Sequence, residues 1–178
     1  MMGTTHAAFA LLCYYLIAYF GGLPFDAPIV LTSLVAGSLL PDIDHPKGFL
    51  AQQLHLLRRT SRCIGKLVAH RGIFHSFLVA LVATAVVWVI AMFYRWETLA
   101  VACFSLGFIS HLAADSLNPT GIRWLQPFSK AKVEGGIRTG SAVEKLLFLL
   151  IIAAISVIVY TAHPEWFNIF LEQGLPRV

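Results

Sequence analysis

Long apolar segments constrain the fold of this chain more than any other feature of its sequence. Three of them, at residues 75–94, 97–117 and 144–162, each hold about 19–21 residues. A helix of about 20 apolar residues spans the hydrocarbon core of a bilayer, which is about 30 Å thick. The sequence therefore predicts at least three membrane-spanning helices.

Two shorter apolar segments precede these three. They lie at 6–20 and 27–40, hold about 14–15 residues each, and are separated by Gly21, Gly22 and Pro24, which break helices. They are short for a crossing, so they either cross where the bilayer thins or form a hairpin that leans on the longer helices. The prediction is an all-α, integral membrane bundle of about five apolar helices.

The composition agrees with a membrane protein of one domain. Of the 178 residues, 58% are hydrophobic and 12% are charged, whereas about 25% are charged in a typical soluble domain. This excludes a disordered chain, a basic nucleic-acid-binding domain and an ordinary soluble protein. We expect a membrane-embedded domain at 1–162 and a short tail at 163–178, for which an interfacial helix and an unstructured end are equally consistent. Membrane lipids are the expected partners, with no direct contact to nucleic acid.

The distribution of basic residues predicts an orientation. Ten of the 13 Lys and Arg residues lie in two connections, at 41–74 and 119–142, while the opposite connections at 21–26 and 95–96 hold one. Because cytoplasmic loops are rich in Lys and Arg, both basic connections should be cytoplasmic. With five crossings, the N-terminus is then cytoplasmic and the C-terminus lies outside.

Ionisable residues gather where helices begin and end at this predicted cytoplasmic rim. Such residues near membrane depth indicate a function. Two short runs, at residues 41–45 and 111–118, are the strongest evidence for a functional site. The candidates are His6, Asp42, Asp44, His45, His70, His75, His111, Asp115 and Glu144.

The residue types favour a metal site. His and Asp are ligands of zinc, manganese and iron, and His111 and Asp115, four residues apart, share one helical face that Asn118 extends. The absence of a Cys-rich pattern favours a catalytic site over a closed structural one. More ligands are present than one tetrahedral ion needs, so we expect one or two divalent ions, zinc first, with manganese or iron as alternatives. The expected ligands are His6, Asp42, His45, His70, His75, His111 and Asp115.

Three further residues are candidates for a catalytic role. Asp44 and Glu144 could act as a general base or could orient a ligand. Arg71 could hold an anionic group, or could serve only as a cytoplasmic anchor. His55 and His163 are expected to lie outside the site, in a basic loop and in the tail.

These residues resemble a known family. The sequence is similar to the YdjM-type bacterial inner-membrane metal-dependent hydrolases, also described as LexA-regulated or LexA-binding. The resemblance covers about residues 4–145 and implies a multi-pass inner-membrane location and hydrolase activity, without naming a substrate. No motif here indicates a LexA association, so the protein partner stays unknown. The matching elements are Thr5–His6, residues 40–45, residues 70–76, residues 110–115, residues 118–121, residues 139–141 and Glu144.

A more distant likeness is to zinc-dependent phospholipase C and its nuclease relatives. These all-helical enzymes hold clustered zinc ions with an early His, an Asp, another His and a His-x-x-x-Asp helix. The likeness implies that His6, Asp42, His70, His111 and Asp115 fill those places in order. That family adds a His-x-x-x-Glu helix, whereas Gly140 stands four residues before Glu144 here. One or two ions are therefore expected rather than three.

The functional expectation combines these observations. We expect a metal-dependent hydrolase that acts on a phosphoester or other ester, a lipid first, at the cytoplasmic face of the membrane. A metal-binding transporter is one alternative, although it would need polar residues deeper in the helices. A non-catalytic membrane adaptor that tethers a partner through its basic loops is the other.

Overall fold

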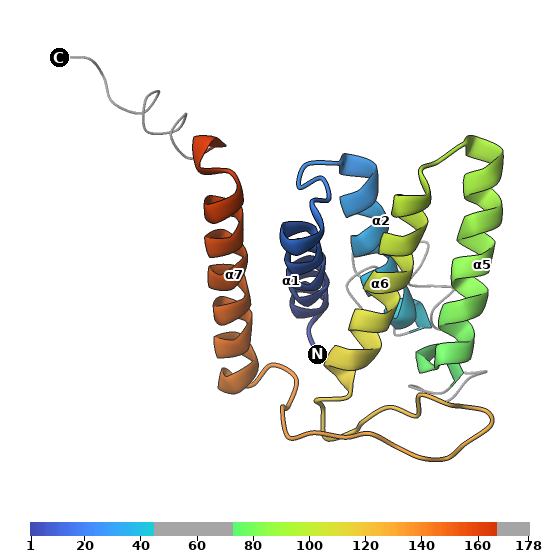
Figure 1. The fold of residues 1–178 in the computed structure, drawn as a ribbon. Helices are drawn as coiled ribbons and strands as arrows, with labels where there is room; N and C mark the ends of the chain where they lie inside the picture. Colours follow the sequence, from blue (N-terminus) through green and yellow to red (C-terminus); the bar gives the residue numbers. More distant parts are fainter. Residues whose placement is uncertain (45–72, 167–178) are drawn as a thin grey trace.

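The computed structural model describes residues 1–44 and 73–166. Its regular secondary structure is helical, apart from one isolated bridge between Ile122 and Val133. The predicted all-α bundle with five apolar helices is confirmed (Figure 1). In chain order the elements are α1 (Gly3–Gly21), α2 (Pro28–Leu39), the 3₁₀ helices η1 (Leu40–Asp44) and η2 (Ile73–His75), α5 (Phe77–Tyr94), α6 (Thr98–Asp115) and α7 (Ala142–Ala162).

Local sequence signals explain where most helices begin and end. Gly22 adopts a left-handed conformation, with φ of 65°, and ends α1. Pro28 is the first residue of α2, a position whose N–H has no acceptor within the helix, so the absence of an N–H in proline costs no hydrogen bond. The hydroxyl oxygens of Ser76 and Ser141 accept backbone N–H groups of the first turns of α5 and α7. Side-chain caps therefore fix the two helices that follow the basic connections.

The lengths of the first two helices differ from one another more than the apolar segments predicted. With 19 residues, α1 is long and apolar enough to cross a membrane, as are α5, α6 and α7. The prediction of a short first helix was wrong because the helix also includes residues 3–5, of which Thr5 is polar but faces the interior. The 12 residues of α2 are short, as predicted. Because η1 continues from α2, the two together extend about 28 Å.

The centre of the bundle is the contact between α2 and α6. A Cβ atom added at Gly37 would lie 2.1 Å from the carbonyl oxygen of Phe104, and one added at Gly107 would lie 2.1 Å from that of Leu34. Only glycine permits so close an approach of the two backbones. This pair of glycines sets the position of the end of α2 relative to the end of α6.

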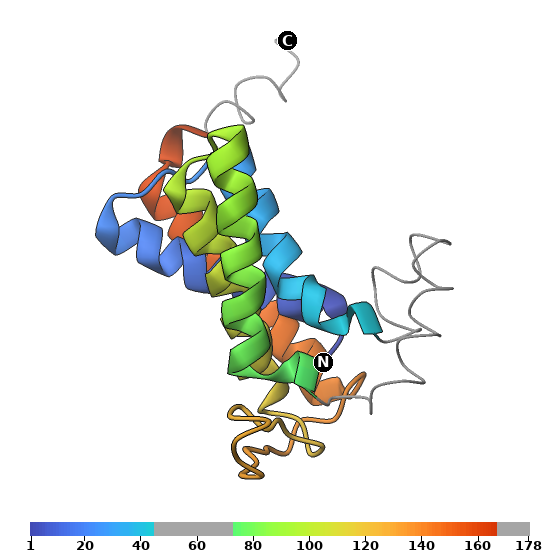
Figure 2. The same ribbon diagram turned by 90° about the vertical axis from the view of Figure 1, so that its right-hand side faces the viewer.

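The remaining helices surround this pair. α1 packs against α2, α6 and α7, whereas α5 packs against α6 and η2. Figures 1 and 2 show α5 and α7 on opposite sides of the bundle. Their outer faces carry large exposed apolar side chains, among them Trp88 and Met92 on α5 and Leu149 and Val157 on α7. Such faces suit contact with lipid chains.

The beginnings of α1, α5 and α7 and the ends of α2 and α6 lie at the same end of the bundle (Figure 1). The connection at 116–141 crosses this end, and its buried Ile122 packs with Phe108 and Leu112 of α6 and Ala80 of α5. Segments more than 100 residues apart in the sequence therefore meet here. We call this end the polar end of the bundle.

Candidate metal centre

Five of the predicted ligands meet at the polar end. They come from four elements: His6 from α1, Asp42 from η1, His75 from η2, and His111 and Asp115 from α6. The three histidine side chains are 0% exposed, and Asp115 is 1% exposed. The Asp42 side chain is 22% exposed. Burying most of a cluster of two carboxylates and three imidazoles is costly unless the groups compensate one another or bind an ion.

His75 and His111 each lie close to both carboxylates of the cluster. The Nε2 atom of His75 lies 3.5 Å from Asp42 Oδ1 and 4.0 Å from Asp115 Oδ2. The Nε2 atom of His111 lies 3.8 Å from Asp42 Oδ1 and 3.9 Å from Asp115 Oδ2. Around a tetrahedral ion with metal–ligand distances of about 2.0–2.2 Å, neighbouring ligand atoms stand about 3.3–3.6 Å apart. The four nitrogen–oxygen distances are therefore close to those that a bound divalent ion would set.

His6 extends the cluster on one side. Its Nε2 atom lies 3.3 Å from Asp115 Oδ1, and its ring stacks on that of His111 with 3.8 Å between the ring centroids. Ligand atoms of His6, Asp42 and His111 lie within 4.8 Å of one another, and so do those of His75, His111 and Asp115. Since His111 belongs to both groups, the donor set suits one ion fully or two ions that divide the carboxylates.

The ring nitrogens of this cluster are suited to bind a cation. Both nitrogens of His6 and of His75, and Nε2 of His111, are buried and make no hydrogen bond of normal geometry within the described residues. Leaving a buried polar atom without a partner costs about 1–3 kcal/mol. The three Nε2 atoms lie 3.3–4.0 Å from carboxylate oxygens, and a divalent ion between them would satisfy both sets of lone pairs. The residues present therefore fit a metal ion.

The second nitrogen of His111 fixes how that ring is oriented. His111 Nδ1 lies 2.7 Å from the backbone carbonyl oxygen of Ser38 in α2. A carbonyl oxygen only accepts, so Nδ1 carries the proton and the lone pair of Nε2 points to the carboxylates. Sequence analysis missed Ser38, because a backbone carbonyl gives no residue-type signal; the neighbouring Gly37 in an apolar helix was the available hint.

Asp115 is held from its other oxygen. Its Oδ1 atom accepts from Asn118 Nδ2 at 2.7 Å and from the amino group of Met1 at 2.6 Å. The backbone carbonyl oxygen of Asn118 in turn accepts from the N–H groups of Gly121 and Gly135 in the connection that crosses the polar end. Asn118, which the sequence placed on the same face as His111 and Asp115, therefore links Asp115 to that connection.

Glu144 is buried at the polar end but makes a different kind of contact. Its carboxylate oxygens accept the backbone N–H groups of Met2 at 2.6 Å and Gly140 at 2.5 Å. Its own N–H donates to the hydroxyl oxygen of Ser141, so the residue closes the first turn of α7 and ties it to the start of α1. These contacts involve backbone groups and Ser141 rather than a predicted ligand, so both predicted roles of Glu144, general base and orienting residue, stay predictions.

Other predicted residues are not placed in this cluster. Asp44 ends η1, but its side chain lies outside the described residues, as do His45, His70 and Arg71 and the excluded His55. His163 lies beyond the far end of α7, where it stacks on Trp166 at 4.2 Å and contacts Glu165 Oε1 at 2.9 Å. That hydrogen bond from His163 lowers the pKa of the Glu165 carboxyl. As expected, His163 lies away from the site.

The fold and the cluster define a class: a multi-pass helical membrane protein with a buried His and Asp site at one end of the bundle. The sequence matches the family described as YdjM inner membrane protein over residues 1–172, so the chain belongs to that family. This membership, with several apolar helices, makes it a multi-pass protein of the bacterial inner membrane.

Curated relatives agree with the family. The chain is 39% identical over 105 residues to inner membrane protein YdjM of Escherichia coli K12 and of Shigella flexneri, a match over 55% of this chain and 49% of each relative. It thus spans about half the length of these relatives. It is 28% identical over 148 residues to the uncharacterized protein YvsG of Bacillus subtilis 168, covering 83% of this chain and 87% of that protein. No solved structure matches.

Proposed function

We propose that this protein is a membrane-embedded, metal-dependent hydrolase of esters or phosphoesters, with its site at the cytoplasmic headgroup level. The observation that carries the proposal is the set of buried imidazole nitrogens that face two carboxylates and make no hydrogen bond within residues 1–44 and 73–166. The chemistry that a divalent ion supplies in such a set is activation of water and stabilisation of negative charge on an ester or phosphoryl oxygen. Zinc is the first choice, because the donors are nitrogen and oxygen at near-tetrahedral separations.

Each residue of the cluster has a distinct task in this proposal. His75, His111, Asp42 and Asp115 hold the ion, and His6 either completes its coordination or holds a second ion. Asn118 and the carbonyl oxygen of Ser38 orient Asp115 and His111 by hydrogen bonds of 2.7 Å. Asp44 and Arg71 are proposed as general base and anion-binding residue from the sequence alone.

The distribution of buried polar residues favours a hydrolase over a transporter. Within the described part of the chain, the buried polar residues of the helices lie at the polar end or within two helical turns of it. A transport path needs polar groups or cavities that continue to the opposite side. The opposite end is instead packed by an apolar cluster of Tyr14, Phe25, Val30 and Leu34. A site at one rim suits chemistry on a molecule that reaches the bilayer surface.

Turnover measurements test the proposal. The protein is purified in mild detergent, loaded with zinc or manganese, and offered phospholipids, soluble phosphoesters and carboxylic esters. We expect turnover of at least one ester class, lost in Asp42→Asn and Asp115→Asn and retained in His163→Ala. If metal-loaded protein hydrolyses none of these esters, the hydrolase proposal is wrong, and a metal-binding transporter or a non-catalytic membrane adaptor becomes the better hypothesis.

A further inference from the structure

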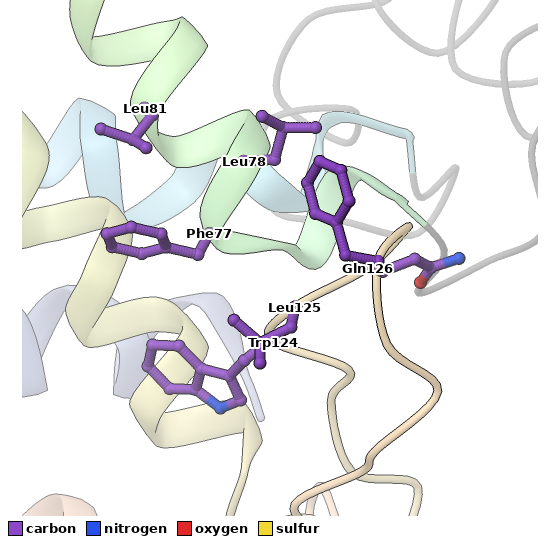
Figure 3. Close-up of a pocket in the computed structure, with 7 residues that line it drawn as sticks. Phe77, Leu78, Leu81, Trp124, Leu125 and Gln126 are labelled. Atoms are coloured by element: carbon purple, nitrogen blue, oxygen red, sulfur yellow. The ribbon is translucent and has the colours of Figure 1, made fainter.

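A small apolar pocket opens beside the candidate metal centre. It has a volume of about 110 Å³ and lies between the first two turns of α5 and the connection that crosses the polar end (Figure 3). Phe77, Leu78 and Leu81 form the helix side, and Trp124, Leu125 and Phe128 form the other side. Leu81, Leu125 and Phe128 are more than half exposed, so the pocket is open to its surroundings rather than sealed in the core.

Both walls of the pocket are attached to predicted metal ligands. Phe77 follows His75 by two residues, and its N–H donates to the carbonyl oxygen of Trp124 at 2.8 Å. The indole N–H of Trp124 donates to the hydroxyl oxygen of Ser116 at 2.8 Å, and Ser116 directly follows Asp115. The pocket is therefore held in a fixed position next to the site.

An apolar stripe continues from the pocket along α5. A second, more open hollow of about 380 Å³ lies over Val82, Ala85, Val86, Val89 and Ile90. These residues follow Leu78 and Leu81 at helical spacings of three and four, so they share one face of the helix. From Leu78 to Val89 the helix rises about 16 Å. The pocket and stripe form one apolar track that leads from the metal centre toward the opposite end of the bundle.

We infer that this track binds one acyl chain of an anionic lipid and so presents its headgroup to the metal centre. The inference rests on the proposed function and specifies its substrate class. Three observations support a lipid: the track faces outward along a membrane-spanning helix, it begins beside the site, and exposed Arg123, Lys130 and Arg138 lie in the connection that forms one pocket wall. Basic side chains at headgroup level favour anionic lipids.

Photolabelling tests this inference without relying on turnover. The protein is reconstituted into vesicles of phosphatidylethanolamine and phosphatidylglycerol that contain a phosphatidylglycerol with a photoreactive group near the start of one acyl chain. Labelled residues are identified by mass spectrometry. Leu81→Trp fills the pocket, and Leu149→Trp is the matched control, because Leu149 is a similarly exposed leucine on α7 (62% exposed, against 54% for Leu81).

We expect labelling to concentrate on the pocket residues of α5 and of residues 124–128. Leu81→Trp should lower that labelling about tenfold, which corresponds to the lost burial of roughly two methylene groups, while Leu149→Trp leaves it unchanged. Equal labelling of α5 and α7, no effect of Leu81→Trp, or cross-links through this face to a second copy of the chain would overturn the inference. Pocket labelling without turnover of any ester would instead refute the hydrolase proposal and leave lipid binding standing.

Discussion

His111 makes three separate contacts within the candidate site. One ring nitrogen donates to the carbonyl oxygen of Ser38, the other faces Asp42 and Asp115, and the ring itself stacks on His6. Sequence spacing predicted that His111 and Asp115 share a helical face. It could not predict the contacts of His111 with Ser38 and His6, because these depend on how three helices pack.

Asn118 provides a prediction about an outer contact. Asn118→Leu keeps the size of the side chain but removes the N–H donor to Asp115 Oδ1. Loss of such a supporting hydrogen bond lowers metal affinity about 10–100-fold. Competition titration with a zinc chelator measures this affinity, and Ser129→Ala, a polar truncation in the same connection, serves as the control. Unchanged affinity in Asn118→Leu would show that Asp115 needs no such support.

Glu144 provides a prediction that separates orientation from ligation. Glu144→Gln replaces one acceptor oxygen by an NH₂ group that faces a backbone N–H, so we expect the protein to lose about 1–3 kcal/mol of stability. The melting temperature in detergent reports this loss. Metal affinity should fall less than in a variant of a direct ligand such as Asp115→Asn. A fall as large as that of Asp115→Asn would instead place Glu144 among the ligands.

At the scale of helices, the close approach of α2 and α6 sets the geometry of the site. Gly107→Ala would bring a Cβ atom to 2.1 Å from the carbonyl oxygen of Leu34, so the helices must move apart. We expect a loss of about 1–3 kcal/mol from overpacking and weaker metal binding, because Asp42 follows α2 and His111 lies on α6.

Gly136→Ala is the control for this prediction, because a Cβ atom there meets no atom within 4 Å. The melting temperature and the zinc affinity are measured for both variants. If Gly107→Ala matches the wild-type protein in both quantities, the glycine contact does not set the site.

The helices also show where sequence reasoning succeeds and where it fails. Apolar segments located all five helices, since membrane-spanning length leaves a strong signal. The same criterion began α1 at His6, although the helix begins at Gly3. Hydropathy places the polar Thr5 outside the segment and His6 at its edge, whereas the fold buries both. A polar first turn that faces a site cannot be distinguished from a loop by hydropathy.

At the scale of the whole molecule, the polar residues converge at one end because helices alternate in direction. The sequence predicted this convergence from the Lys and Arg distribution, before any contact was known. The structure brings His6, Asp42, His75, His111 and Asp115 together. The sequence left Asn118 and Glu144 off the list of expected ligands, but it could not predict that Asn118 contacts Asp115 or that Glu144 contacts the backbone of Met2 and Gly140, because these contacts depend on how the helix ends pack.

The orientation of the molecule is a prediction of the same scale. In a background without the native cysteines, Lys130→Cys should react with a membrane-impermeant maleimide only after cells are opened, and Arg95→Cys should react in intact cells. The reason is the excess of basic residues on the side that carries the polar end. Labelling of Lys130→Cys from outside would reverse the orientation and move the proposed site to the periplasmic face.

The most direct test of the central claim is the metal content of the purified protein. Four proteins are purified in parallel after growth with added zinc: the wild type, His111→Ala, Asp115→Ala and His163→Ala. Their metal content is measured by inductively coupled plasma mass spectrometry. We predict about one or two divalent ions per wild-type chain, the same content in His163→Ala, and loss of metal in both His111→Ala and Asp115→Ala. Equal metal content in all four proteins, or no metal in the wild type, would contradict the assignment of this cluster as a metal centre.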